Sequence, residues 1–104
     1  MDTFFIYVTT KDKAEARGIG QYLVQSRLAA CVNIFDNMSS MYIWQDEFQD
    51  DQEAVLIAKT TEQRVPELIA AIKSRHSYEV PCIVCLPIRD GNPDFLQWIA
   101  GQVK

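Results

Sequence analysis

Residues 30–61 read ACVNIFDNMSSMYIWQDEFQDDQEAVLIAKTT, and this stretch decides the fold. Its two arms, at about 30–44 and 47–61, contain many apolar, β-branched and aromatic residues. Two such arms on either side of the polar residues 45–47 predict a β-hairpin. The Asp-Asn pair at 36–37 interrupts the first arm and predicts a bend or a β-bulge there.

The predicted hairpin is too long for the body of a domain of this size. An arm of about fifteen extended residues spans roughly 50 Å, whereas a compact globule of about 100 residues has a radius of gyration of about 13 Å. The outer part of the hairpin is therefore expected to project from the body, and it carries Tyr42, Trp44 and Phe48. These aromatic side chains are costly to leave in water. A partner chain is the simplest cover, and symmetric homo-oligomers are common, so the sequence predicts self-association.

The chain before the hairpin predicts one strand and one helix. Residues Thr3–Thr9 are rich in β-branched and aromatic residues, which is typical of a buried strand. Asp12 is the expected N-cap of the following helix, with Glu15 as its capping-box partner. Gly18 and Gly20 lie within that helix, where a missing side chain allows another backbone to approach closely.

The chain after the hairpin predicts a second helix, a last strand and a short final helix. The second helix has apolar residues at helical spacing, and Pro66 favours a later start for it than a capping box of Thr60 and Gln63. Residues 82–88 predict the last strand. Asn92, which precedes a proline, is the expected N-cap of the final helix.

The resulting element order is βαββαβ followed by a C-terminal helix. This order is typical of an α+β, ferredoxin-like antiparallel sheet. Pro81 and Pro87 are separated by an even number of residues, so their missing amide donors lie on one side of the predicted last strand. A strand that lacks donors on one side belongs at the edge of a sheet.

Length and composition predict one globular domain, residues 1–104. The chain is 48% hydrophobic, and its net charge of −4 disfavours nucleic-acid binding, which needs a basic face. The apolar run at 4–8 is far shorter than the ~20 residues of a membrane-spanning helix, and it lacks the flanks of a signal peptide. An odd number of cysteines, three, fits reduced thiols and predicts a cytoplasmic protein without a membrane partner.

Several residues carry chemistry that the sequence leaves open. His76, the only histidine, is either a metal ligand or a hydrogen-bonded structural residue. Cys82 and Cys85 form a C-x-x-C motif, but residues three apart on a strand face opposite sides, so small buried side chains are the simpler interpretation. Lys59 lies in an apolar strand, where it serves either a ligand or an ion pair.

The hairpin offers two further candidate groups. Five acidic residues lie close together and either gather divalent cations or solvate the hairpin tip, the favoured interpretation: Asp46, Glu47, Asp50, Asp51 and Glu53. Tyr42 and Trp44 share one strand face and line either a ligand cleft or an oligomer interface. No phosphate-binding loop, serine-hydrolase motif or zinc-protease motif is present.

Five motifs, in order and over nearly the whole chain, resemble those of the CutA divalent-cation tolerance family. They are LAACVNI at 28–34, SMYIW at 40–44, KTT at 59–61, HSYEVP at 76–81 and DGNPDFLQWI at 90–99. The resemblance implies a ferredoxin-like subunit in a tight homotrimer, an architecture that PII-type signalling proteins also use. It implies a role in copper and heavy-metal tolerance, with copper binding described for some members of the family. It does not imply a known reaction.

The sequence departs from the family pattern at the copper ligands. In bacterial members these ligands are proposed to be a cysteine late in the first strand and two adjacent histidines. Residues 4–9 contain no cysteine, and the histidine pair reads Arg75-His76, so only His76 carries over. Cys82 stands where the family has a glutamate and offers a substitute donor. Ser77 and Asp46 replace a proline and the glycine of the hairpin turn.

Two functions follow as expectations. The first is a non-enzymatic homotrimer that binds copper or another divalent cation, with His76 and Cys82 as ligands and no organic cofactor, and supports metal tolerance. The alternative is a trimeric, PII-like signalling regulator that binds a small molecule in clefts between subunits. Because the family motifs are aromatic and cationic, that ligand cleft is expected to use Tyr42, Trp44, Lys59 and Tyr78 together with His76.

Overall fold

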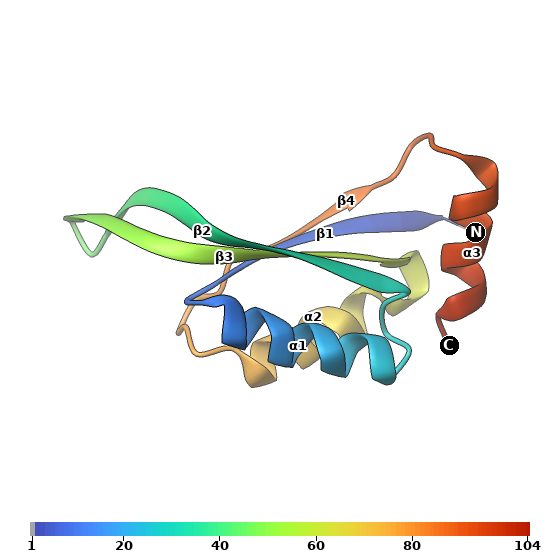
Figure 1. Ribbon diagram of the computed structural model, residues 1–104, viewed down its shortest axis with the longest axis horizontal. Coiled ribbons are helices and arrows are strands. Elements are labelled where there is room, and N and C mark those ends of the chain that lie inside the picture. Colours follow the sequence, from blue (N-terminus) through green and yellow to red (C-terminus); the bar gives the residue numbers. More distant parts are fainter. Residues whose placement is uncertain (1) are drawn as a thin grey trace.

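Two helices cover one face of a four-stranded antiparallel sheet, and a third lies at one end of it (Figure 1). This computed structural model describes residues 2–104. The strands are β1 (Thr3–Thr10), β2 (Cys31–Trp44), β3 (Glu47–Thr61) and β4 (Ile83–Pro87). The helices are α1 (Lys13–Gln25), the 3-10 helix η1 (Glu62–Arg64), α2 (Val65–Arg75) and α3 (Pro93–Gln102). The predicted α+β order is confirmed.

The sheet has the strand order β2-β3-β1-β4, with every neighbouring pair antiparallel. This order confirms that β4 is an edge strand. Its predicted start was wrong, because the strand begins at Ile83 and leaves Pro81 and Cys82 in the preceding loop. Of the two prolines that predicted an edge strand, only Pro87 belongs to β4, where it pairs with Phe4 at the end of the ladder.

The core lies between the sheet and the helices α1 and α2. Alternate residues of β1 and β3 are fully buried, as are the inward residues of both helices: Ile6, Val8, Leu56, Ala58, Leu23, Leu68 and Ile72. Burying one such large side chain stabilises the fold by about 1.5–3 kcal/mol. A Cβ atom at Gly20 would lie 3.0 Å from Val32 Cγ2 and 3.2 Å from Leu56 Cδ1, so this glycine lets α1 approach the sheet closely.

The hairpin of β2 and β3 projects from this body, as the sequence predicts (Figure 1). The molecule measures 44 × 25 × 22 Å, and the hairpin extends along the longest axis. Gln45 and Asp46 form the turn with φ values of 51° and 67°, which is the left-handed pair of a two-residue hairpin turn. Glu47 belongs to β3 rather than to the predicted turn. The predicted interruption at 36–37 is a break in register between Phe35 and Met38.

The structure confirms the predicted start of α1 and decides between the two predicted starts of α2. Asp12 Oδ1 accepts a hydrogen bond from the Glu15 amide at 2.8 Å, which confirms the N-cap of α1. The second helix begins at Val65 with Pro66 in its first turn, so the later of the two starts is right. Thr60 caps no helix, because its hydroxyl donates to the Leu28 carbonyl oxygen. None of the helices in residues 2–104 has both the length and the hydrophobicity to span a bilayer.

Candidate functional site

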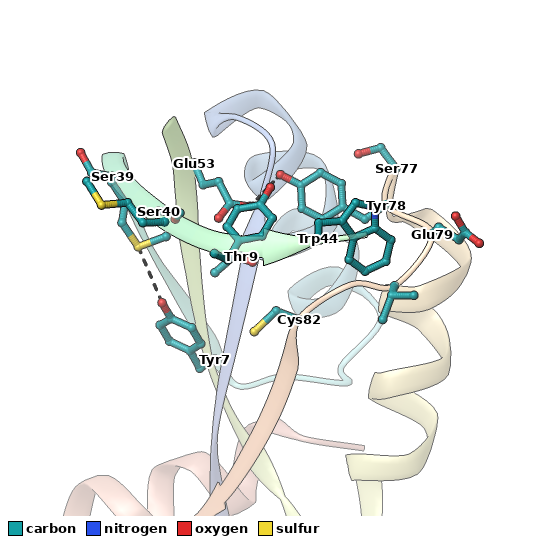
Figure 2. A pocket seen from close by; sticks show the side chains of 14 residues that line it. Tyr7, Thr9, Ser39, Ser40, Trp44, Glu53, Ser77, Tyr78, Glu79 and Cys82 are labelled. Atoms are coloured by element: carbon teal, nitrogen blue, oxygen red, sulfur yellow. Dashed lines mark hydrogen bonds between the residues drawn. The ribbon is translucent and has the colours of Figure 1, made fainter. Parts of the chain in front are cut away.

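The concave side of the hairpin and the segment 76–82 border an open cavity of about 790 Å³ (Figure 2). We call it the hairpin cavity. It is lined by four aromatic residues, two acidic residues and three sulfur-containing residues, among others: Tyr7, Tyr42, Trp44 and Tyr78; Glu53 and Glu79; Met38, Met41 and Cys82. A cavity of this volume is large enough for a small organic ligand.

Strand alternation sends the hairpin's aromatic residues to two different faces. Tyr42 and Trp44 line the hairpin cavity together, as their shared strand face predicts. Phe48 is different, because it pairs across the strands with Ile43 on the opposite face. The side chains of Ile43 and Phe48 are 66% and 64% exposed. The hairpin therefore has one face for the cavity and a second, apolar face in open contact with solvent.

Tyr78 and Glu53 join the two walls of the hairpin cavity. The Tyr78 hydroxyl donates to Glu53 Oε2 at 2.7 Å, and Glu53 as a residue is only 7% exposed. Burial, followed by this bond to a carboxylate, raises the pKa of Tyr78 far above its ordinary value. The phenol therefore keeps its proton and stays a donor. Tyr42 similarly donates to Asp51 Oδ2 at 2.7 Å, and this bond raises the pKa of Tyr42.

His76 holds the 76–82 segment in place through both ring nitrogens. Nε2 lies 2.7 Å from the Thr9 carbonyl oxygen, and Nδ1 lies 3.1 Å from the Tyr78 amide nitrogen. A carbonyl only accepts and an amide only donates, so the proton is on Nε2 and Nδ1 is the acceptor. The imidazole also lies 4.8 Å from the Tyr78 ring. The sequence left His76 either as a metal ligand or as a hydrogen-bonded structural residue. These contacts are those of a hydrogen-bonded structural residue.

The predicted metal ligands lie in different surroundings. Cys82 is exposed and lines the hairpin cavity, whereas His76 is not among the residues that line it. Within residues 2–104 no group of three histidine, cysteine or acidic side chains comes together as a metal site. Cys85 pairs with Ile6 and is half-buried, and its burial raises the pKa of its thiol.

Lys59 lies away from the hairpin cavity. It pairs with Cys31 and Phe5 on β2 and β1, and its ammonium group donates to Asn33 Oδ1. It is not a lining residue, so one chain does not bring it together with Tyr42, Trp44 and Tyr78. Its hydrogen-bond partner is the neutral Asn33 amide, and the salt bridges within residues 2–104 do not include it.

Glu53 is a site residue that sequence reasoning missed. The acidic cluster was predicted to be solvated, and this is right for the exposed Asp50 but wrong for Glu53. The available signal was the alternation along β3, since Glu53, Val55 and Ile57 share one strand face. Counted from the hairpin turn, position 53 is the first buried residue on that face.

Glu15 ties the 76–82 segment to the start of α1 instead of closing the predicted capping box. Its carboxylate accepts from the Lys11 amide at 3.0 Å and from the Ser77 amide at 2.8 Å. Partial burial raises the pKa of Glu15, but these hydrogen bonds outweigh it and hold the pKa below its ordinary value of 4.5. The charged form of the Glu15 carboxylate therefore stabilises the folded state.

A pH dependence of stability follows from Glu15. Because folding lowers this pKa, the stabilisation is complete above the unfolded value and is lost as the pH falls through the folded one. We expect the urea midpoint of the wild-type protein to fall further than that of Glu15→Gln between about pH 7 and about pH 3. Urea unfolding of both proteins at equal protomer concentration checks this. Equal losses of stability would show that Glu15 makes no such contribution.

Comparison with known proteins gives a consistent result. Residues 4–102 match the sequence model of the family described as CutA1 divalent ion tolerance protein. A protein of Thermus thermophilus named "Divalent-cation tolerance protein CutA" is 45% identical over 94 residues, which cover 90% of this chain and 91% of the relative. Plant and animal relatives are longer, and the chain spans 56% of the rice protein and 52% of the mouse protein.

Solved structures show the same architecture. A structure described as "Divalent cation tolerance protein (Cut A1)" of Thermus thermophilus superposes with a TM-score of 0.95 at 41% identity, covering 98% of this chain and 99% of that one. The Archaeoglobus fulgidus protein, described as a "Periplasmic divalent cation tolerance protein CutA", has a TM-score of 0.94 at 37% identity, with coverage of 98% and 99%.

Proposed function

This chain belongs to the CutA1 divalent ion tolerance protein family, and from that membership we propose that it supports tolerance to divalent cations, copper foremost. The match over residues 4–102 is the observation that carries the proposal. We propose that it acts by binding metal and not as an enzyme, because its one imidazole is held by two backbone hydrogen bonds and is not free to serve as a base. The PII-like alternative gains no support from relatives named for cation tolerance.

The proposed metal site lies at a boundary between copies of the chain. Cys82 presents an exposed thiol at the rim of the hairpin cavity, and no three donors gather in residues 2–104 of one copy. A second copy is the simplest source of the missing donors. A thiolate ligand favours copper(I) over copper(II), since soft donors select the soft ion. His76 contributes a nitrogen only if it gives up one of its hydrogen bonds.

The proposed assembly is a homotrimer in the cytoplasm. The cross-strand pair Ile43 and Phe48 forms an apolar face on the projecting hairpin, and Phe35 and Leu86 are also exposed on the sheet face that α1 and α2 leave open. Apolar surface of this kind favours burial against another chain. The three free cysteines support a reducing compartment.

Copper(I) titration tests the proposed site. We expect reduced protein to bind copper(I) more tightly than copper(II), and Cys82→Ser to weaken copper(I) binding by about tenfold or more, because it removes the sulfur donor. Competition with a copper(I)-selective chromophoric chelator gives the affinities. Cys85→Ser is the matched control, since that residue packs against the core and does not line the hairpin cavity, and its effect is expected to be within about twofold.

The same variants connect binding to tolerance. In a bacterial strain that lacks its own CutA protein, the wild-type chain is expected to restore growth on copper, and Cys82→Ser is expected to restore less. Growth curves over a copper series measure this effect. If Cys82→Ser binds and protects as well as the wild type, the site is not at Cys82. If the wild type itself gives no protection, the proposed function is wrong.

A further inference from the structure

Glu53 is a buried carboxylate without a cation. The residue is only 7% exposed, and the side-chain hydrogen bond that it accepts within residues 2–104 comes from a neutral phenol, that of Tyr78. The ion pairs within residues 2–104 are Arg64 with Glu67 and Arg89 with Asp90, and neither involves Glu53. Acidic side chains are almost never this buried unless a positive partner accompanies them. Residues 2–104 of one copy therefore supply no salt-bridge partner for Glu53.

The wall around Glu53 contains no residue that supplies this charge. Lysine, arginine and histidine are all absent from the residues that line the hairpin cavity, whereas Glu79 adds a second acidic group. Lys11 and Glu53 border a second, smaller cavity of about 180 Å³, but no salt bridge joins them. The larger cavity is thus acidic and open to a positively charged guest.

Aromatic rings complete the surroundings of the carboxylate. Figure 2 shows Trp44 from β2, Glu53 from β3 and Tyr78 from the 76–82 segment around one space, and Tyr42 also lines it. The faces of such rings attract cations, tryptophan most strongly, and several rings together are the usual surroundings of alkylammonium groups. Both tyrosine hydroxyls are occupied by carboxylates, which fixes the rings in place.

We propose that the hairpin cavity binds a small organic cation of the alkylammonium class, with Glu53 as its counter-charge and the rings of Trp44, Tyr42 and Tyr78 around its ammonium group. The proposal goes beyond metal tolerance and does not depend on it. Aromatic rings and a single buried carboxylate suit a weakly hydrated organic cation better than a divalent metal, which needs several oxygen, nitrogen or sulfur ligands. The volume of about 790 Å³ leaves room for a larger group beyond the ammonium.

Choline is a suitable probe, because 3,3-dimethylbutan-1-ol has the same shape without the charge. Isothermal titration of the wild-type assembly, in buffer with a metal chelator, is expected to show choline binding about tenfold or more tightly than the neutral isostere. Glu53→Gln is expected to weaken choline binding by about tenfold, and Trp44→Leu by a similar factor. Neither substitution is expected to change the weak affinity for the isostere by as much.

Asp50→Asn is the matched control for Glu53→Gln. Asp50 lies on the same strand but is exposed and does not line the hairpin cavity, so removing its charge is expected to change choline affinity by no more than about twofold. Equal affinity for choline and the isostere, or no binding of choline, would overturn the proposal even if Glu53→Gln failed to fold. Direct binding of magnesium ions to the wild-type assembly, measured without choline and lost in Glu53→Gln, would make this a metal site and would also overturn it.

Discussion

Aspartate in place of both Ile43 and Phe48 is expected to reduce the assembly from three times the 11.9 kDa of one chain to a single chain. The two side chains face each other across the hairpin, are 66% and 64% exposed, and lie on the face turned away from the hairpin cavity. Burying an unpaired carboxylate in an apolar interface costs several kcal/mol. This cost applies to each of the two substitutions in every copy of the chain. Light scattering coupled to gel filtration measures the mass.

A charge-matched pair of substitutions separates interface disruption from simple repulsion. Gln21→Asp with Gln63→Asp adds the same two negative charges at exposed positions outside the hairpin, and this variant is expected to keep the wild-type mass. Circular dichroism shows whether the hairpin variant remains folded. A wild-type mass of 11.9 kDa would contradict the proposed homotrimer directly. An unchanged mass in the hairpin variant would place the interface on another surface.

Leu68→Ala is expected to lower the free energy of unfolding by about 2–5 kcal/mol, since it opens a cavity at a fully buried position. Leu68 lies on α2, the helix that ends at Arg75, directly before the 76–82 segment. Loosening α2 is therefore expected to weaken ligand binding in the hairpin cavity as well. Urea unfolding gives the free energy, and all proteins must be compared at one protomer concentration because assembly adds to stability.

Ile69→Ala is the control for this variant. Ile69 is the next residue of the same helix and is only half-buried, so the loss is expected to be less than about half of that for Leu68→Ala. Both substitutions are on the same helix and delete a group of the same size, so the two variants differ mainly in how deeply the deleted group is buried. Equal losses for the two variants would mean that burial in the core does not set the cost at these positions.

Arg75 illustrates a substitution whose role the sequence did not show. It stands where the family resemblance places a histidine, and the sequence indicated only that a copper ligand was missing at this position. In the structure its guanidinium lies 3.4 Å from the centre of the Tyr22 ring, so it joins the end of α2 to α1. An arginine stacked on a ring is stabilised by the charge and by the flat packing surface. Position 75 therefore contributes to helix packing.

The sequence by itself determined the arrangement of the strands and helices. Apolar periodicity, the N-caps at Asp12 and Asn92 and the hairpin arms predicted the αβ order and the projecting hairpin correctly. These features are local, because each depends on residues within a few positions of one another, and local patterns are visible in a linear sequence. The outer edge position of β4 also followed, from the proline that cannot donate to a ladder.

The tertiary structure decided which of the candidate residues share a site. The curl of the hairpin over the 76–82 segment brings Glu53 against Tyr78, 25 positions along the chain, and buries a carboxylate that an acidic sequence context predicted to be solvated. The same contact network occupies both nitrogens of His76 and leaves Lys59 outside the cavity. Burial and hydrogen-bond partners depend on chain segments far apart in sequence, and no local pattern at a residue specifies what covers it.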